Sequence, residues 1–265
     1  ATAIQADPAF SNEAALLKEE LESFTSFKFN ANQNSFNSIL LVLDKTLPTE
    51  AYTLSVSNNQ IKISASQPIG IFYAIQSLKS AMPLVAWKTK QGSLDVPCME
   101  VKDQPRFGYR GLHIDVARNF QTKEQVKRVL NWMAMYKLNK LHFHFSEDDA
   151  WRVEIPALPE LTTVGVKRGH TLDSKENMPS SYGSGGDINN IQSSFYTRND
   201  YIDILKHAKS KFIDVIPEIE TPGHARAAIK AMDARYARLM KEGKSEEAKQ
   251  YLLSDPNDQS VYVSA

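Results

Sequence analysis

In Leu141-His-Phe-His-Phe-Ser-Glu-Asp-Asp149, apolar and polar side chains alternate, and three acidic side chains follow. Successive side chains of a β-strand point to opposite faces, so one face of this segment is apolar and the other carries His142 and His144. An apolar face that packs on helices, opposite a polar face, is typical of a barrel strand whose polar side leads to a site.

Two other segments of the chain have the same design. They are Tyr109-Arg-Gly-Leu-His-Ile-Asp-Val-Ala-Arg118 and Val215-Ile-Pro-Glu-Ile-Glu-Thr-Pro-Gly-His224. The earlier one carries a histidine and an aspartate opposite its aliphatic face, and the later one carries Glu218 and Glu220 on one face. Each of the three ends in groups suited to binding or acid-base chemistry, and barrel enzymes build their sites from these carboxyl ends.

Helical patterns follow the predicted strands, which argues for parallel βα units. Thr122 and Gln125 have the spacing of a capping box and predict a helix over about 123–137. Thr197 caps a second helix in the same way, and a third begins at about Ala225. The sequence therefore predicts an α/β fold that contains the first three βα units of a (β/α)8 TIM barrel.

Residues 1–104 precede the barrel and predict a small α+β domain. Apolar periodicity predicts helices over about 12–23 and after Pro68, and strands over about 38–43, 52–56, 61–65 and 96–101. The Asn58-Asn59 turn joins the strands over 52–56 and 61–65 in a predicted hairpin. Pro105 marks the junction, because a proline biases the residue before it to extended geometry. We expect the second domain, over 105–265, to be a truncated barrel.

A long segment separates the second predicted strand from the second predicted helix. It runs from Trp151 to Tyr196, far longer than a routine βα connection. Long loops at this face of a barrel usually shape the substrate cleft, so the segment is a candidate wall of a pocket.

The composition indicates a globular protein with a neutral, polar partner. Lysine plus arginine equal aspartate plus glutamate, 31 each, so the chain has no excess positive charge that would favour binding to nucleic acid or to an anionic membrane. Cys98 is the single cysteine, which excludes an internal disulfide and a cysteine-based zinc site. No stretch approaches the roughly 18 apolar residues of a membrane helix. The start at Ala1 lacks a signal peptide and a methionine, and we expect that an N-terminal segment was removed.

Each chemical group has a plain structural interpretation when it is taken alone. An isolated arginine such as Arg118 is usually a surface or structural residue, and Asp148 with Asp149 resembles a cap of the next turn. The His-x-His pair permits a metal site, although satisfied interior histidines are commoner. Trp151 is as well explained by packing as by a platform for a sugar.

Taken together, the motifs resemble the β-N-acetylhexosaminidases of glycoside hydrolase family 20. The resemblance rests on Pro105–Phe120, Lys137–Arg152 and Pro217–His224, and on Gly70–Leu78 in the first domain. It covers nearly all of the chain. It implies removal of terminal N-acetyl-β-D-hexosamine (GlcNAc or GalNAc) with retention, in which the acetamido oxygen of the substrate is the nucleophile.

The resemblance also implies roles for individual residues. Arg118 matches an arginine that binds sugar hydroxyls. Glu147 falls where the family usually has an aspartate, and His224 matches the histidine that supports the catalytic acid together with that residue; Asp148 and Glu220 are further supporting positions. A shifted alignment would give Asp148 the role of Glu147. The family needs no cofactor and no metal, so His142 and His144 are interpreted as interior hydrogen-bonding residues.

The catalytic Asp-Glu pair of the family, which follows a Gly-Gly, is missing from these 265 residues. Gly185-Gly186-Asp187 is superficially similar, but Ile188 follows where a glutamate is needed. We expect the pair after Ala265 and expect the isolated chain to be inactive. The unpaired edges of an open parallel sheet favour self-association or disorder after Asp255.

Two alternative functions stay open at this point. A metal-dependent amidohydrolase also carries His-x-His on a barrel strand, and bound zinc would favour it. A non-catalytic carbohydrate-binding protein would keep Arg118 and the cleft without the acid. For both the enzyme and the carbohydrate-binding protein, the expected partner is an N-acetylhexosamine-terminated glycan. The favoured location is the periplasm or the exterior of the cell.

Overall fold

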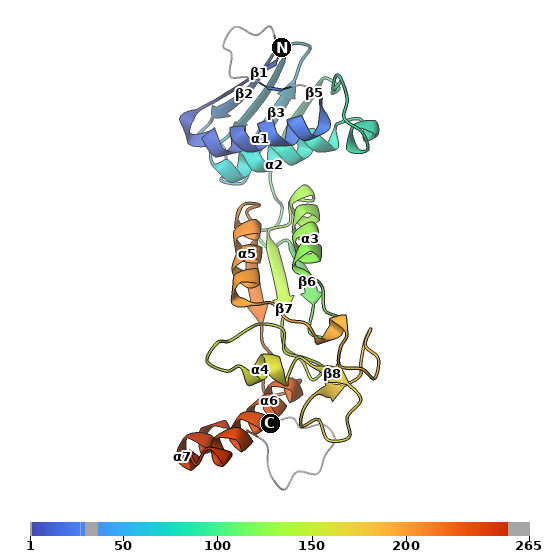
Figure 1. Ribbon diagram of the computed structural model, residues 1–265. Coiled ribbons are helices and arrows are strands. Elements are labelled where there is room, and N and C mark those ends of the chain that lie inside the picture. Colours follow the sequence, from blue (N-terminus) through green and yellow to red (C-terminus); the bar gives the residue numbers. More distant parts are fainter. Residues whose placement is uncertain (1, 27, 30–36, 254–265) are drawn as a thin grey trace. The chain divides into compact units, whose positions relative to one another are not determined.

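The chain folds into two compact units. The computed structural model describes residues 2–26, 28–29 and 37–253. One unit is formed by residues 1–110 with 133–138, and the other by residues 111–132 with 139–265 (Figure 1). The disorder expected after Asp255 falls outside the described residues, and the domain boundary after residue 104 stays a prediction.

A five-stranded sheet with two helices packed against it forms the first unit (Figure 1). The strands are β1 (Thr2–Ala6), β2 (Asn37–Leu43), β3 (Tyr52–Val56), β4 (Gln60–Ala65) and β5 (Met99–Asp103). The helices are α1 (Ser11–Phe24) and α2 (Pro68–Ser80), with short 3-10 turns η1 (Pro8–Phe10) and η2 (Leu84–Trp87). The strand order is β1-β2-β4-β3-β5, in which β3 runs antiparallel to both of its neighbours and the other pairs are parallel.

Most predicted elements of this unit are confirmed, and two strands differ. The predicted β3–β4 hairpin and both helices are present. β1 was not predicted, because Ala3 is its only buried residue and the strand has no alternating apolar pattern. Its extended form comes from parallel pairing with β2. The last strand runs from Met99 to Asp103 rather than over 96–101, because its antiparallel register with β3 pairs Met99 with Val56 and Asp103 with Tyr52.

Gly70, in the first turn of α2, allows the helix to approach the sheet closely. A Cβ atom at this position would lie 2.5 Å from the Ala51 carbonyl oxygen and 2.8 Å from the Ala65 Cβ. We therefore expect Gly70→Ala to lower the free energy of unfolding by about 1–3 kcal/mol, because backbone must move to relieve the overlap. Urea unfolding followed by circular dichroism measures the loss. Gly92→Ala is the matched control, since no atom lies within 4 Å of its added Cβ; equal midpoints for the two variants would contradict the expectation.

Three parallel strands in the order β10-β7-β6 form the sheet of the second unit (Figure 1). They are β6 (Gly111–Asp115), β7 (Lys140–His144) and β10 (Asp214–Glu218), and a two-stranded ladder joins β8 (Arg168–Gly169) to β9 (Met178–Pro179). The helices that begin in this unit are α3 (Lys123–Met135), α4 (Glu160–Thr163), α5 (Arg198–Lys209), α6 (Arg226–Lys241) and α7 (Ser245–Ala248), with η3 (Ile191–Ser193) and η4 (Lys249–Tyr251). The end of α3, from Met133, is counted with the first unit. None of the helices within residues 2–26, 28–29 and 37–253 has the length and apolar character needed to cross a membrane.

The predicted alternation places the core on one face of this sheet. Leu141 and Phe143 are fully buried, and the Phe145 ring meets Tyr201 of α5 edge-on with the ring centroids 5.2 Å apart. The opposite face carries histidine and glutamate side chains. Because the strands are parallel and in register, their carboxyl ends meet at one edge, where the chemical groups gather.

Both predicted capping boxes are confirmed. The Thr122 hydroxyl accepts from the Gln125 N–H while the Gln125 side chain accepts from the Thr122 N–H, and Thr197 and Asp200 are paired in the same way. α3 ends at Met135, two residues earlier than expected, and α6 starts at Arg226. Self-association through the outer edges of β6 and β10 stays a prediction.

Candidate functional site

Three carboxylates surround the guanidinium group of Arg118, just beyond β6. Its Nη1 donates to Asp115 Oδ2 at 2.6 Å, its Nη2 donates to Glu147, and its Nε lies 4.0 Å from Asp149 Oδ2. Burial opposes the charge, but the hydrogen bond to Asp115 and the negative charges of Glu147, Asp115 and Asp149 raise the pKa of Arg118 above its usual value. The side chain is still 37% exposed. Arg118 is therefore charged, oriented and open to a polar ligand.

Glu147 lies between Arg118 and His224. Its side chain is 3% exposed, and one oxygen, Oε1, contacts Arg118 Nη2 and lies 2.7 Å from His224 Nδ1. Its other oxygen accepts from the Asp148 N–H. Burial raises the pKa of Glu147 above its usual value, although the Asp148 N–H and the charges of Arg118 and His224 act in the opposite direction.

His224 is the exposed end of this chain of contacts. Its side chain is 60% exposed, and its backbone has a φ of 55°, a left-handed conformation that is uncommon for a residue other than glycine. The residue lies in the turn between β10 and α6. Its free surface is available to a further group, while Nδ1 faces Glu147.

The two aspartates after Glu147 have separate partners. The Asp148 carboxylate accepts from the N–H of Arg226 at 3.0 Å, so it holds the first residue of α6. Asp149 accepts from Arg168 Nη2 at 3.2 Å. The interpretation of this pair as a cap of the next turn is therefore wrong: Asp148 binds a helix start that is distant in the sequence, which residue spacing does not reveal.

Glu220 lies apart from the Arg118–Glu147–His224 contacts. Its backbone N–H donates to Ser146 Oγ at 2.8 Å, and its Oε1 lies 3.8 Å from His144 Nδ1. Of the five predicted site residues, the structure thus joins Arg118, Glu147 and His224 directly, connects Asp148 to Glu147 through a backbone hydrogen bond, and places Glu220 beside the histidines of the sheet.

Two fully buried arginines anchor the long 152–196 segment, and the sequence interpretation assigned neither of them. Arg152 donates to four backbone carbonyl oxygens at 2.6 to 2.9 Å, those of Val116, Ala117, Gln192 and Ser194. Burial, followed by the charge of Arg168, lowers the pKa of Arg152 to about 9. The group is still protonated at neutral pH.

Arg168 connects the same segment to the backbone of Arg118. Its Nη1 donates to the Arg118 carbonyl oxygen at 2.7 Å, while Nη2 binds Asp149. Gln192 adds a second link, since its side chain accepts from the Phe120 N–H at 2.7 Å and donates to Asn119 Oδ1 at 2.9 Å. A single arginine or glutamine within a polar loop has no periodic signal, so the sequence pattern could not identify these contacts.

Trp151 has a packing role. It is 9% exposed, and its indole N–H donates to the Val153 carbonyl oxygen at 2.6 Å. A sugar platform needs an open ring face, so this structure favours the packing interpretation over the platform that the sequence had left open.

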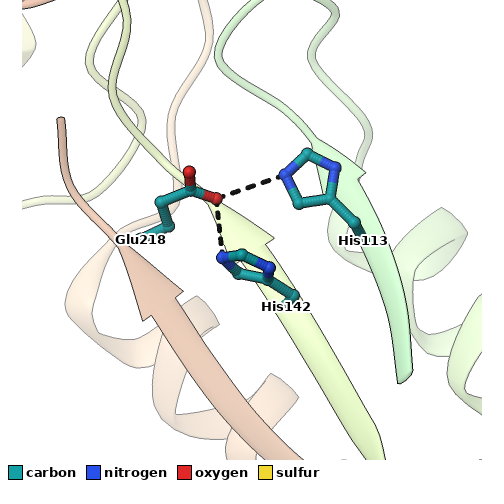
Figure 2. Close-up of side chains that lie close together, drawn as sticks. All are labelled: His113, His142 and Glu218. Carbon is teal, nitrogen blue, oxygen red and sulfur yellow. Dashed lines mark hydrogen bonds and ion pairs between the residues drawn. The ribbon is translucent and has the colours of Figure 1, made fainter. Parts of the chain in front are cut away.

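Imidazole and carboxylate groups converge on the polar face of the sheet. Figure 2 shows His113, His142 and Glu218 pointing toward one another from β6, β7 and β10. They are one of three groups within the described residues whose donor atoms are close enough to hold a metal; the others are His144, Glu218 and Glu220, and Glu147, Asp148 and His224.

Comparison with known families accounts for both units. Residues 107–263 match "Glycosyl hydrolase family 20, catalytic domain", and residues 1–104 match "Glycosyl hydrolase family 20, domain 2". The chain belongs to glycosyl hydrolase family 20. The β6, β7 and β10 units are accordingly the first part of the family's (β/α)8 barrel, preceded by a small α+β domain, as predicted.

Curated relatives in this family are much longer than the chain. A β-hexosaminidase from Vibrio vulnificus is 42% identical over 86% of the chain and 26% of the relative. An N,N'-diacetylchitobiase from Vibrio harveyi is 46% identical over 79% of the chain and 23% of the relative. The chain therefore spans about a quarter of the length of these relatives.

Solved family 20 structures have the same fold. An exo-β-N-acetylglucosaminidase from Vibrio harveyi, in complex with N-acetylglucosamine, superposes with a TM-score of 0.76 at 34% identity, covering 88% of the chain and 35% of that structure. A β-N-acetylhexosaminidase from Streptomyces coelicolor gives a TM-score of 0.70 at 29% identity, covering 86% and 44%.

Proposed function

We propose that this chain is the sugar-holding front part of a β-N-acetylhexosaminidase, which removes terminal N-acetyl-β-D-hexosamine residues from glycans. One observation carries the assignment: Arg118 is held by Asp115 and Glu147, and His224 contacts the same oxygen of Glu147. A charged, oriented and partly open guanidinium suits the vicinal hydroxyls of a sugar. The family membership and the names of the relatives support the substrate class.

Each site residue has a role in this proposal. Arg118 binds sugar hydroxyls. Glu147 orients both Arg118 and His224 through its Oε1, and the exposed surface of His224 supports the catalytic acid. Asp148 and Glu220 are supporting positions, since Asp148 holds the start of α6 directly after the His224 turn, and Glu220, two residues after β10, is held by Ser146.

These contacts favour Glu147 over Asp148 in the proposed supporting role. Glu147 reaches both Arg118 and His224, whereas the Asp148 carboxylate is engaged with the Arg226 N–H. We therefore assign the role to Glu147. The extra methylene of glutamate relative to the usual aspartate is accommodated while contact with both partners is kept.

The proposed reaction retains the configuration of the anomeric carbon. The acetamido oxygen of the substrate attacks that carbon, a glutamate protonates the leaving oxygen, and the same glutamate then deprotonates the water that opens the intermediate. An aspartate next to that glutamate orients the acetamido group. No adjacent Asp-Glu pair occurs in the 265 residues, so we assign the pair to sequence beyond Ala265.

We expect the 265-residue chain to show no detectable hydrolysis of a chromogenic N-acetyl-β-glucosaminide, because the proton donor is missing. The natural-length gene product, assayed beside it, is expected to turn the substrate over at a rate typical of enzymes, about 1–1,000 per second. Turnover by the purified short chain that survives removal of contaminating enzyme would contradict the first expectation. Inactivity of both proteins, with saturable binding of N-acetylglucosamine by the longer one, would instead support a carbohydrate-binding protein.

We also propose the domain boundary at Gln104–Pro105, with domains over 1–104 and 105–265. The two family matches, which end at residue 104 and begin at residue 107, support this position. Expression of residues 105–265 with the natural downstream sequence, and of 1–104 alone, tests whether each part folds.

A further inference from the structure

Three imidazole rings crowd one carboxylate oxygen on the polar face of the sheet, near the carboxyl ends of β7 and β10. Glu218 Oε2 lies 2.7 Å from His142 Nε2 and 3.2 Å from His113 Nε2, the two contacts drawn in Figure 2. His144 Nδ1 lies 3.1 Å from the same oxygen. Strand register sets the arrangement, because His113 pairs with His142 and His144 pairs with Glu218 in the sheet ladder.

Hydrogen bonding alone does not explain this arrangement well. One carboxylate oxygen has two lone pairs, so three N–H groups aimed at it cannot all form good hydrogen bonds. A bound cation would remove this competition, because neutral imidazoles would offer their nitrogen lone pairs to the metal instead of directing N–H groups at the oxygen.

We propose that His113 Nε2, His142 Nε2 and Glu218 Oε2 bind one divalent first-row transition cation of the Zn²⁺ type. In this arrangement His144 keeps its contact with Glu218 as a hydrogen-bond donor and orients the carboxylate, as outer partners of metal ligands commonly do. The site is separate from the proposed hydrolysis, which uses no metal, and it goes beyond that function.

The observed nitrogen–oxygen separations are close to those of such a site. Metal–ligand distances of about 2.0–2.1 Å at angles between 90° and 110° put neighbouring ligand atoms about 2.9–3.4 Å apart. The nitrogen–oxygen separation is 3.2 Å for His113, which lies in this range, and 2.7 Å for His142, which is slightly below it. All three donor atoms lie within 4.8 Å of one another, and the rings of the two ligand histidines meet edge-on with centroids 4.8 Å apart.

The donor set selects the class of cation. Two imidazole nitrogens with one carboxylate suit Zn²⁺ and its first-row neighbours, whereas Mg²⁺ and Ca²⁺ require oxygen ligands. The side chains of His113 and His142 are 49% and 38% exposed, so solvent can reach the site and water can complete the coordination. The alternative group with His144 and Glu220 fits less well, because His144 is 5% exposed and its Nδ1 is 3.8 Å from Glu220.

Binding would connect all three strands of the sheet through one ion. A ligand that binds the folded state and not the unfolded state stabilises the fold as its concentration rises above the dissociation constant. We therefore expect Zn²⁺ to raise the melting temperature of the 265-residue chain.

The test uses metal-free 265-residue chain carrying Cys98→Ser, which removes the only thiol and hence a competing soft ligand. Equilibrium dialysis with elemental analysis measures Zn²⁺ per chain, and Co²⁺ substitution reports the ligand field by visible absorption. We expect one saturable Zn²⁺ per chain, with affinity reduced at least tenfold by Glu218→Gln and by His113→Ala. The half-exposed position of His113 makes its variant the safer one for folding, which circular dichroism of the metal-free proteins verifies.

His170→Ala is the matched control, because His170 is exposed and belongs to none of the three candidate metal groups in the described residues. Its Zn²⁺ affinity is expected to equal that of the parent. The proposal is overturned by the absence of saturable binding, by binding that survives both cluster variants, or by binding that is lost in His170→Ala. The Zn²⁺-binding measurement does not depend on the outcome of the hydrolysis assay, and the hydrolysis assay does not depend on whether Zn²⁺ binds.

Discussion

Arg118→Ala is expected to lower kcat/KM of the natural-length enzyme for a chromogenic N-acetyl-β-glucosaminide by about 10²- to 10⁴-fold. A hydrogen bond from a charged donor contributes about 1.5–3 kcal/mol, and a guanidinium that binds two hydroxyls makes two of them. Each 1.4 kcal/mol corresponds to about a tenfold change. The substitution also removes the cation that faces Asp115 and Glu147, so the carboxylates are left to repel each other.

Two further variants show whether the effect belongs to the guanidinium group. Arg118→Lys keeps the charge but loses the planar fork, and an intermediate loss is expected. Arg198→Ala removes an exposed arginine at the first position of α5 and is expected to leave kcat/KM unchanged. Wild-type kinetics in a folded Arg118→Ala enzyme would rule out the proposed sugar contact.

Arg152→Met is expected to lower the free energy of unfolding by about 4 kcal/mol or more. The guanidinium is fully buried and is a donor to four backbone carbonyl oxygens, two before Arg118 and two in the 192–194 turn. Methionine fills much of the volume but donates no hydrogen bond, and each buried acceptor left without a partner costs about 1–3 kcal/mol. A loss of this size is a large fraction of the roughly 5–15 kcal/mol that stabilises a typical domain.

Thermal and urea unfolding of the 265-residue chain measure this loss, with tryptophan fluorescence reporting on the neighbouring Trp151. Arg128→Met is the matched control, because Arg128 is an exposed residue of α3, and its effect is expected to stay within about 0.5 kcal/mol. If the Arg152 and Arg128 variants unfold at the same midpoint, the carbonyl contacts do not hold the long segment in place.

The two large effects are physically connected. Arg152 binds the carbonyl groups of Val116 and Ala117, and Arg168 binds that of Arg118 itself. Two buried arginines of the 152–196 segment therefore hold the backbone of residues 116–118, which carries the proposed sugar contact. The Arg152 contacts join residues that are 35 and 36 positions apart in the sequence.

Local sequence signals were sufficient for most elements of the fold. Alternation over Leu141–Phe145 predicted a strand with an apolar and a polar face, and the Thr122 and Thr197 caps predicted where helices begin. These signals work because side-chain period and cap chemistry depend on residues that are close in the sequence. β1 lacked such a signal, since pairing with β2 and not its own pattern makes it a strand.

Residue types alone also determined which groups lie at the ends of the barrel strands, and hence Arg118, Glu147 and His224 as candidates. Only the tertiary structure showed that Glu147 joins the other two, that Asp148 holds α6, and that Glu218 collects three histidines. Such partnerships depend on distances of a few ångströms between residues far apart in the chain. Strand register and the return of the long loop set those distances, and neither can be read from the order of residues within one segment.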